Sequence, residues 1–255
     1  MADRWHDLDE ATRLPQPQPQ PQPLVDEPIT LPQSGRELRI RRPTDLDALL
    51  DQVADDPEQN LPYWSEIWPS GIALADAILT RSELVTGRPV LEIGSGLGIT
   101  ACAALDAGAV LTVADYSPES LLLTRLNTMR NVGREPVAVQ LNWRRPNLDA
   151  LTVDGGYPVI LAADVLYEPR DIDPLLTLVD ALLAPDGLFW LAEPERPVAA
   201  RFLEAAAAAG WHGATTIHEG PWPDPKDDGV RVRVHELRKT GSESAETGAI
   251  RQSRG

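Results

Sequence analysis

The chain has 255 residues, enough for one domain with a sizeable core, and 42% of them are hydrophobic, which excludes a wholly disordered protein. Its formal net charge of -16 disfavours nucleic acid as a general partner, because an acidic surface repels phosphates. A polar N-terminus, a single cysteine and the lack of any apolar run near the roughly 18 residues of a membrane span predict a cytoplasmic protein with no membrane partner.

The two ends of the chain are polar and of low complexity. Pro15 to Pro23 alternate proline and glutamine, which favours polyproline II, so residues 1–27 are expected to form a disordered arm. This arm is either a linker or a docking site for a proline-binding module. Residues 240–255 are expected to form a disordered tail. Between the ends we expect an N-terminal extension or lid at 28–69 and the main domain at 70–239.

The extension carries short elements. Residues 29–31 and 37–41 could pair as a hairpin, and residues 44–53 form an amphipathic pattern typical of a short helix. A second helix is expected at 70–80, where the main domain begins.

The main domain alternates apolar strands with helices. Strands are expected at 89–93, 110–115, 137–141, 159–163, 188–192, 213–218 and 230–237, and helices at 99–107, 118–132, 175–183 and 197–209. Strands joined through helices require a mostly parallel sheet, whereas no helix separates the last two strands, which should pair antiparallel. The pattern therefore predicts an α/β fold: a Rossmann-like, doubly wound, seven-stranded, mostly parallel sheet with an antiparallel last strand.

A glycine-rich turn follows the first of these strands. The segment 90–98 reads VLEIGSGLG, with glycines spaced G-x-G-x-G. Such a strand–turn–helix places free backbone N–H groups in a crevice, although it could also be only a tight turn. A dinucleotide fingerprint would need glycine at position 99, which is Ile99, so a nicotinamide dehydrogenase is disfavoured. The residues of this turn that we expect at a cofactor site are Glu92, Gly94, Ser95, Gly96 and Gly98.

The spacing resembles the first motif of class I methyltransferases, whose crevice holds S-adenosylmethionine. Asp115, at the end of the next strand, could then accept the ribose hydroxyls, and its neighbour Tyr116 is expected at the same cofactor site. Asp115 could instead cap the following helix, but Ser117 is already placed for that role. Asn142 and Trp143 follow the third strand, where this fold edges the adenine; Trp143 could alternatively be a core or rim aromatic.

The fourth strand ends in Ala163, Asp164 and, three residues later, Tyr167. A carboxylate and a phenol at the carboxyl end of a parallel strand point into the crevice, where the reactive methyl should lie. Asp164 could hold an acceptor amine and Tyr167 could orient it, with Ala163 beside the cofactor. Alternatively, Asp164 only caps the turn.

Three segments together resemble the seven-strand lysine methyltransferases (methyltransferase family 16). Asp164 to Tyr167 is similar to the family's Asp-x-x-Tyr motif, and residues 61–71 are similar to its entry segment, in which a tryptophan at the Trp68 position contacts the cofactor. Residues 193–196, Glu-Pro-Glu-Arg, are similar to the Asp-Pro-Gly-Arg stretch of the electron-transfer-flavoprotein β-subunit branch, with two substitutions. The resemblance spans about residues 60 to 200.

The resemblance implies an S-adenosylmethionine-dependent methyltransferase that N-methylates a protein lysine, with Asp164, Tyr167 and Glu66 as catalytic residues. Glu66 could equally be a solvated loop charge. A small-molecule N-methyltransferase and a non-catalytic cofactor-binding module remain the alternatives. The four histidines lack ligand spacing, so no metal is expected. The acceptor, the number of methyl groups and the oligomeric state do not follow from the sequence.

Overall fold

A computed structural model describes residues 23–54 and 60–239. Most of the predicted arm and the predicted tail, 240–255, lie outside these ranges. Within them, no helix combines the length and the apolar character that a bilayer span requires.

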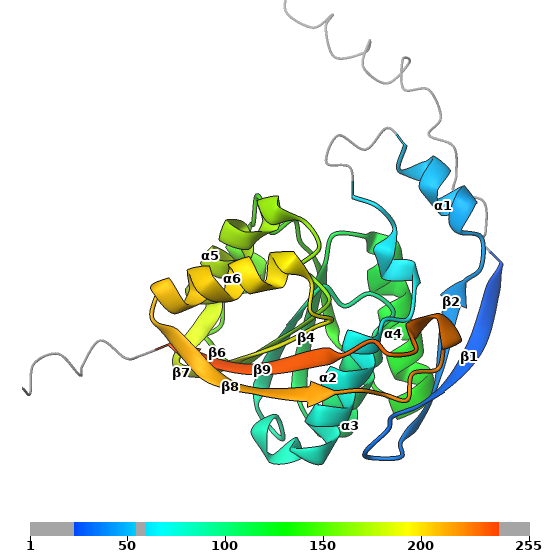
Figure 1. Cartoon of the computed structure of the whole chain (residues 1–255), viewed down its shortest axis with the longest axis horizontal. Helices are drawn as coiled ribbons and strands as arrows, with labels where there is room; N and C mark the ends of the chain where they lie inside the picture. The colour runs from blue at the N-terminus through cyan, green and yellow to red at the C-terminus, as the bar shows by residue number, and fades with distance from the viewer. Residues whose placement is uncertain (1–22, 55–59, 240–255) are drawn as a thin grey trace, which may run out of the picture.

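The described chain is built on a seven-stranded sheet in the order β5–β4–β3–β6–β7–β9–β8 (Figure 1). The strands are β3 (Pro89–Ile93), β4 (Val110–Asp115), β5 (Val137–Gln140), β6 (Tyr157–Ala163), β7 (Leu183–Glu193), β8 (Trp211–His218) and β9 (Val232–Lys239). Strands β3 to β7 pair in parallel, and β9 runs antiparallel to both β7 and β8. The predicted fold class is confirmed.

Helices cover both faces of the sheet. One apolar layer packs under α2 (Pro69–Thr80), α3 (Ile99–Asp106) and α4 (Pro118–Val132), and the other under α5 (Ile172–Leu182) and α6 (Pro197–Ala208). Successive strand residues serve opposite layers: Val90 faces the first and Leu91 the second. Short 3-10 turns lie at Tyr63–Ser65, Ser82–Leu84, Leu148–Ala150, Pro169–Asp171 and Pro225–Asp227.

The N-terminal extension is a hairpin followed by one short helix. Strands β1 (Leu24–Thr30) and β2 (Glu37–Pro43) pair antiparallel beside α4, and α1 (Leu46–Gln52) follows (Figure 1). The hairpin begins earlier than the sequence indicates: residues 24–27, assigned above to the arm, are part of β1. The reason is electrostatic, because Asp26 pairs with Arg41 and Arg130 across the hairpin and onto α4.

A buried asparagine joins the hairpin to the main domain. The Nδ2 of Asn127, on α4, donates to the carbonyls of Arg41 (3.0 Å) and Leu97 (2.9 Å). Its Oδ1 accepts from the Arg41 N–H at 2.8 Å. Asn127 is fully buried, so its polar atoms are satisfied by these bonds instead of by water.

We expect Asn127→Ala to lower the free energy of unfolding by about 2–3 kcal/mol, because the buried backbone groups of Arg41 and Leu97 lose their partners. Urea denaturation followed by circular dichroism measures the change. Leu122→Ala, on the exposed face of the same helix, is the control and should stay within about 0.5 kcal/mol. An Asn127→Ala variant as stable as that control would contradict the role of Asn127 in joining the hairpin to α4.

Candidate functional site

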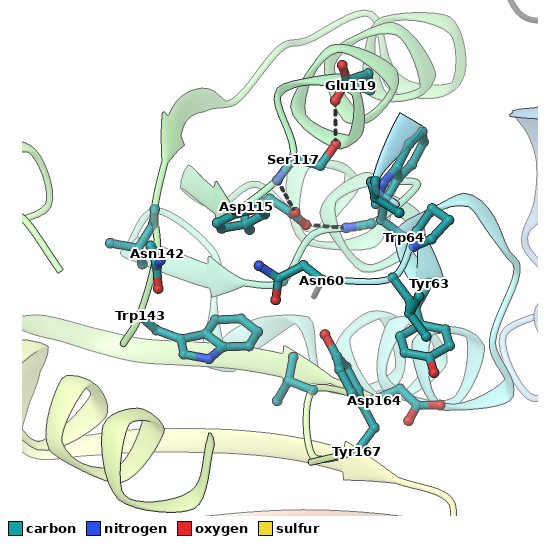
Figure 2. Close-up of a pocket in the computed structure, with 18 of the residues that line it drawn as sticks. Asn60, Tyr63, Trp64, Asp115, Ser117, Glu119, Asn142, Trp143, Asp164 and Tyr167 are labelled. Carbon is teal, nitrogen blue, oxygen red and sulfur yellow. Dashed lines mark hydrogen bonds between the residues drawn. The ribbon is translucent and has the colours of Figure 1, made fainter. Parts of the chain in front are cut away.

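A cavity lies at the carboxyl ends of β3, β4 and β6, and the segment before α2 covers part of it (Figure 2). The predicted site residues that line it are Trp68, Gly94, Gly96, Asp115, Tyr116, Asn142, Trp143, Ala163, Asp164 and Tyr167. The crossover point of a parallel sheet is where α/β folds bind ligands. The structure therefore gathers most of the predicted residues around one space.

Two glycines of the turn serve different purposes. Gly94 has a φ of 73°, and a Cβ there would lie 2.7 Å from Val165 Cγ1, beneath the cavity. Gly98, with a φ of 80°, caps α3, and its Cβ would lie 2.9 Å from the Cα of Thr124 on α4. Gly94 thus keeps the cavity floor open, whereas Gly98 lets two helices pack closely.

Asp115 is buried at the end of β4, beside the glycine turn. Its Oδ2 accepts the Gly96 N–H and its Oδ1 accepts the Ser117 N–H, each at 3.0 Å. Burial raises the pKa of this carboxyl, and the two backbone donors oppose the rise. Ser117, not Asp115, caps α4, because its hydroxyl accepts the Ser120 N–H. Each Asp115 oxygen keeps acceptor capacity for a ligand in the cavity.

Three predicted cofactor residues do not line the cavity. The carboxyl of Glu92 is buried within the sheet. Its burial, and to a smaller extent the negative charge of Asp115, raise its pKa well above the usual range. The Ser95 hydroxyl is buried and accepts a hydrogen bond from Thr124 at 3.2 Å. Together with Gly98, these residues support the turn from behind and are not brought to the cavity.

Trp143 forms one wall of the cavity, and a buried ion pair holds it in place. Its Nε1 donates to Asp171 Oδ1 at 3.0 Å, and Arg144 donates to both oxygens of the same carboxylate at 2.6 and 3.2 Å. Asn142 accepts the Arg144 N–H at 3.0 Å, so it is anchored by the same cluster. The indole is therefore both a core-packed residue and a cavity wall.

Asp164 and Tyr167 lie side by side in the cavity wall (Figure 2). Asp164 has a left-handed φ of 53°, and its Oδ1 accepts a hydrogen bond from Nε of Arg196 at 3.0 Å and lies 3.0 Å from Nη2 in an ion pair. Burial raises the pKa of Asp164, and Arg196 opposes the rise. Burial also raises the pKa of Tyr167, so its hydroxyl stays protonated at neutral pH.

The segment before α2 closes the cavity with aromatic rings. Trp68 donates from Nε1 to the Tyr63 carbonyl at 2.8 Å, and the Tyr63 ring meets the Tyr167 ring at 5.0 Å between centroids. The Trp64 backbone passes close to Gly96. The guanidinium of Arg196 lies 5.8 Å from the centroid of Trp68. These contacts fix the aromatic wall around Asp164.

The predicted catalytic role of Glu66 is not supported by its position. Glu66 does not line the cavity; its carboxylate pairs with Arg42 of β2 at 3.6 Å and with Lys226 of the β8–β9 connection at 3.8 Å. Glu66 therefore ties the aromatic segment to its neighbours. The sequence prediction had no means of locating these distant cations.

Other cavity residues have no assigned role in the sequence analysis. They include Asn60, Tyr63, Trp64, Glu119, Arg144 and Val165. Arg196 was noted only as part of a motif, although it contacts Asp164 directly. The signal that could have found it is its position: it follows the end of β7, next to the end of β6 that carries Asp164.

Comparison with known proteins decides the family. A family model described as lysine methyltransferase matches residues 57–208 of the chain. The chain belongs to the lysine methyltransferase family. The family assignment confirms the predicted resemblance, and S-adenosylmethionine is the cofactor that the family implies.

The curated relatives of this chain include proteins named as lysine methyltransferases and proteins named as arginine methyltransferases. It is 34% identical over 116 residues to the electron transfer flavoprotein β-subunit lysine methyltransferase of Danio rerio, covering 45% of this chain and 42% of that protein. It is 28% identical to the histone-arginine methyltransferase METTL23 of Rattus norvegicus, covering 58% of this chain and 65% of that protein. The chain thus spans less than two thirds of each of these relatives.

The fold has counterparts among solved structures. The 16S rRNA N2 G1207 methyltransferase of T. thermophilus, solved with AdoMet and guanosine, superposes with a TM-score of 0.57 at 16% identity. The match covers 86% of this chain and 52% of that one. At this identity the likeness establishes the fold alone.

Proposed function

We propose that this chain is an S-adenosylmethionine-dependent methyltransferase that N-methylates a lysine side chain of a protein. The observation that carries the proposal is the carboxylate of Asp164, whose side chain is 6% exposed and which shares one cavity with the glycine turn and Asp115. A donor site and an acceptor-binding group thus face the same space.

The residues present fit the cofactor. The oxygens of Asp115 suit the two ribose hydroxyls, and Gly94 leaves room that a Cβ would take. Asn142 and Trp143 offer an amide and a flat apolar face for the adenine, with Tyr116 nearby, and Trp68 closes the cavity over the methyl end. The bound cofactor would supply a methyl group on a positively charged sulfur.

The acceptor side supplies position more than acid–base chemistry. Asp164 lines the cavity, and its carboxylate has acceptor capacity beyond the contacts it makes with Arg196 and Ser70, so it can accept an N–H from an amine. The protonated Tyr167 can donate to or orient the same amine. Both side chains would hold the neutral nitrogen in the cavity so that its lone pair could take the methyl group that the cofactor would supply.

An arginine acceptor is the second candidate. A guanidinium already fits between the Asp164 carboxylate and the face of Trp68, since Arg196 occupies that position. The relatives named histone-arginine methyltransferase favour the same group.

A small-molecule acceptor would be favoured by a crevice closed over by the extension. Leu61 and Tyr63, both on the cavity wall, are 43% and 39% exposed. An apolar rim that is partly open suits an acceptor presented by a protein segment.

Incubating the protein with radiolabelled S-adenosylmethionine and a cell lysate tests the proposal. Acid hydrolysis of the labelled protein fraction should release methyl-lysine. Methyl-arginine would support the second candidate, and label confined to small molecules would support a metabolite acceptor. No transfer to any fraction would contradict a methyltransferase activity.

We further propose a cytoplasmic location. The support is the single cysteine, Cys102, which is buried and whose thiol pKa burial raises, so it is not suited to disulfide exchange.

A further inference from the structure

The two oxygens of Asp164 have different surroundings. Oδ1 accepts a hydrogen bond from Nε of Arg196 at 3.0 Å, and Nη2 of the same guanidinium makes an ion-pair contact with it at 3.0 Å. Oδ2 is buried and makes no hydrogen bond of normal geometry within the described part of the chain, and the Ser70 hydroxyl is the polar group that acts on this carboxyl from α2. The side chain of Asp164 is 6% exposed, so water cannot fully replace a missing partner. One oxygen is therefore held by Arg196, and the carboxylate as a whole belongs to the cavity wall.

Arg196 is held in place on three sides. Its guanidinium lies 5.8 Å from the centroid of Trp68, and its backbone N–H donates to Glu193 Oε2 at 3.1 Å. The other oxygen of Glu193 contacts His235 Nε2 at 3.2 Å, and both of these side chains are buried. The next carboxylate, Glu195, turns instead toward Arg233 and Arg231. Arg196 is thus anchored to Asp164 and does not belong to the surface ion-pair cluster.

This anchoring bears on the protonation state of the acceptor. A lysine amine is a cation at neutral pH, and its lone pair is free for methyl transfer only after it has lost a proton. A buried, unbalanced carboxylate would stabilise the ammonium form and raise the pKa of the amine. A guanidinium on the same carboxylate balances that charge, so the neutral amine becomes more stable relative to the ammonium form.

We propose that Arg196 is a positioning residue that orients Asp164 and balances its charge, so that the carboxylate receives an N–H from a neutral acceptor amine in the cavity. The inference rests on the proposed function. The charged groups facing Asp164 are Arg196, at the start of α6, and Glu193, at the end of β7, while the Ser70 hydroxyl faces it from α2. Arg196 is the only cation among them, within the residues that the structure describes.

The test is a pH profile of label transfer into lysate protein from radiolabelled S-adenosylmethionine, from pH 6.5 to 10. The rate should increase with pH as the acceptor amine loses its proton. In Arg196→Gln the midpoint of this increase should lie about 1 pH unit higher than in the wild type, because the unbalanced carboxylate favours the ammonium form. The rate should be about tenfold lower at pH 7.5 and approach that of the wild type near pH 10. Calorimetry should show S-adenosylhomocysteine binding within about twofold of wild type.

Two further variants separate charge from packing. Arg196→Lys keeps the cation, so the rise of the rate should stay within about 0.3 pH unit of wild type, even where the loss of the planar guanidinium lowers the rate itself. Arg233→Gln removes a nearby cation that contacts Glu195 and not Asp164, and should leave the profile unchanged. An Arg196→Gln profile that falls equally at every pH, or does not shift, overturns the inference. If the wild type transfers no label at any pH, the proposed function itself fails and the inference falls with it.

Discussion

Replacing Asp164 by asparagine is expected to lower kcat for methyl transfer at least about 100-fold, whereas the Kd of S-adenosylhomocysteine stays within about threefold of wild type. An amide cannot present two acceptor oxygens, so it cannot bind Arg196 and the acceptor amine at once. Asparagine tolerates the left-handed φ of 53° at this position, so the backbone is preserved. Single-turnover transfer of the labelled methyl group and calorimetry measure the two effects.

Asp173→Asn, an exposed carboxylate at the start of α5, is the matched control and should behave as wild type. Equal losses of transfer and of S-adenosylhomocysteine binding in Asp164→Asn would show that Asp164 acts on the cofactor or on the fold. That outcome would contradict the assignment of Asp164 to the acceptor.

The second large effect is expected for Gly94→Ala, which should raise the Kd of S-adenosylhomocysteine at least about 30-fold. The added methyl group would lie 2.7 Å from Val165 Cγ1, so the turn or the cavity wall must shift. The φ of 73° adds backbone strain for alanine. Calorimetric titration measures the affinity, and thermal unfolding confirms that the variant is folded.

Gly133→Ala separates strain from steric exclusion. Gly133 has a similar φ of 70° at the end of α4, but a Cβ there would meet no atom within 4 Å. This variant should lose about 1 kcal/mol of stability and keep wild-type affinity. Equal affinities in the two variants would contradict a cofactor cradle at Gly94.

Local patterns predicted the sheet well. The apolar run before the glycine turn became β3 with the predicted bounds, Pro89–Ile93, because a buried parallel strand is apolar on both faces and a turn ends it. Strand β7 begins at Leu183, five residues earlier than predicted, because its first residue pairs with Tyr157 across a register shift. Such a pairing depends on the partner strand and is absent from the local sequence.

The buried face of α4 is harder to predict than the strands, because the N-terminal hairpin packs against this helix. Leu122 and Met129 share a face of α4, yet they are 63% and 45% exposed. The side that carries Asn127 is buried instead, because the hairpin packs there through side-chain hydrogen bonds. Hydrophobic periodicity alone does not reveal a polar contact between segments 86 residues apart.

In the candidate site, too, residues at strand ends could be predicted from the local sequence, whereas residues that depend on distant partners could not. Asp115 and Asp164 follow from their positions at strand ends, where parallel sheets bind ligands, and the structure brings both to the cavity. Glu66 and Arg196 depend on partners distant in sequence, so the first was given a catalytic role that its ion pairs do not support and the second was given none.

Calorimetric titration of the protein with S-adenosylhomocysteine, with NAD as the control, tests the central claim most directly. The glycine spacing, the Asp115 oxygens and the lysine methyltransferase family predict one site with micromolar affinity for S-adenosylhomocysteine and no binding of NAD. Absence of S-adenosylhomocysteine binding by folded protein, or preferential binding of NAD, would contradict the account.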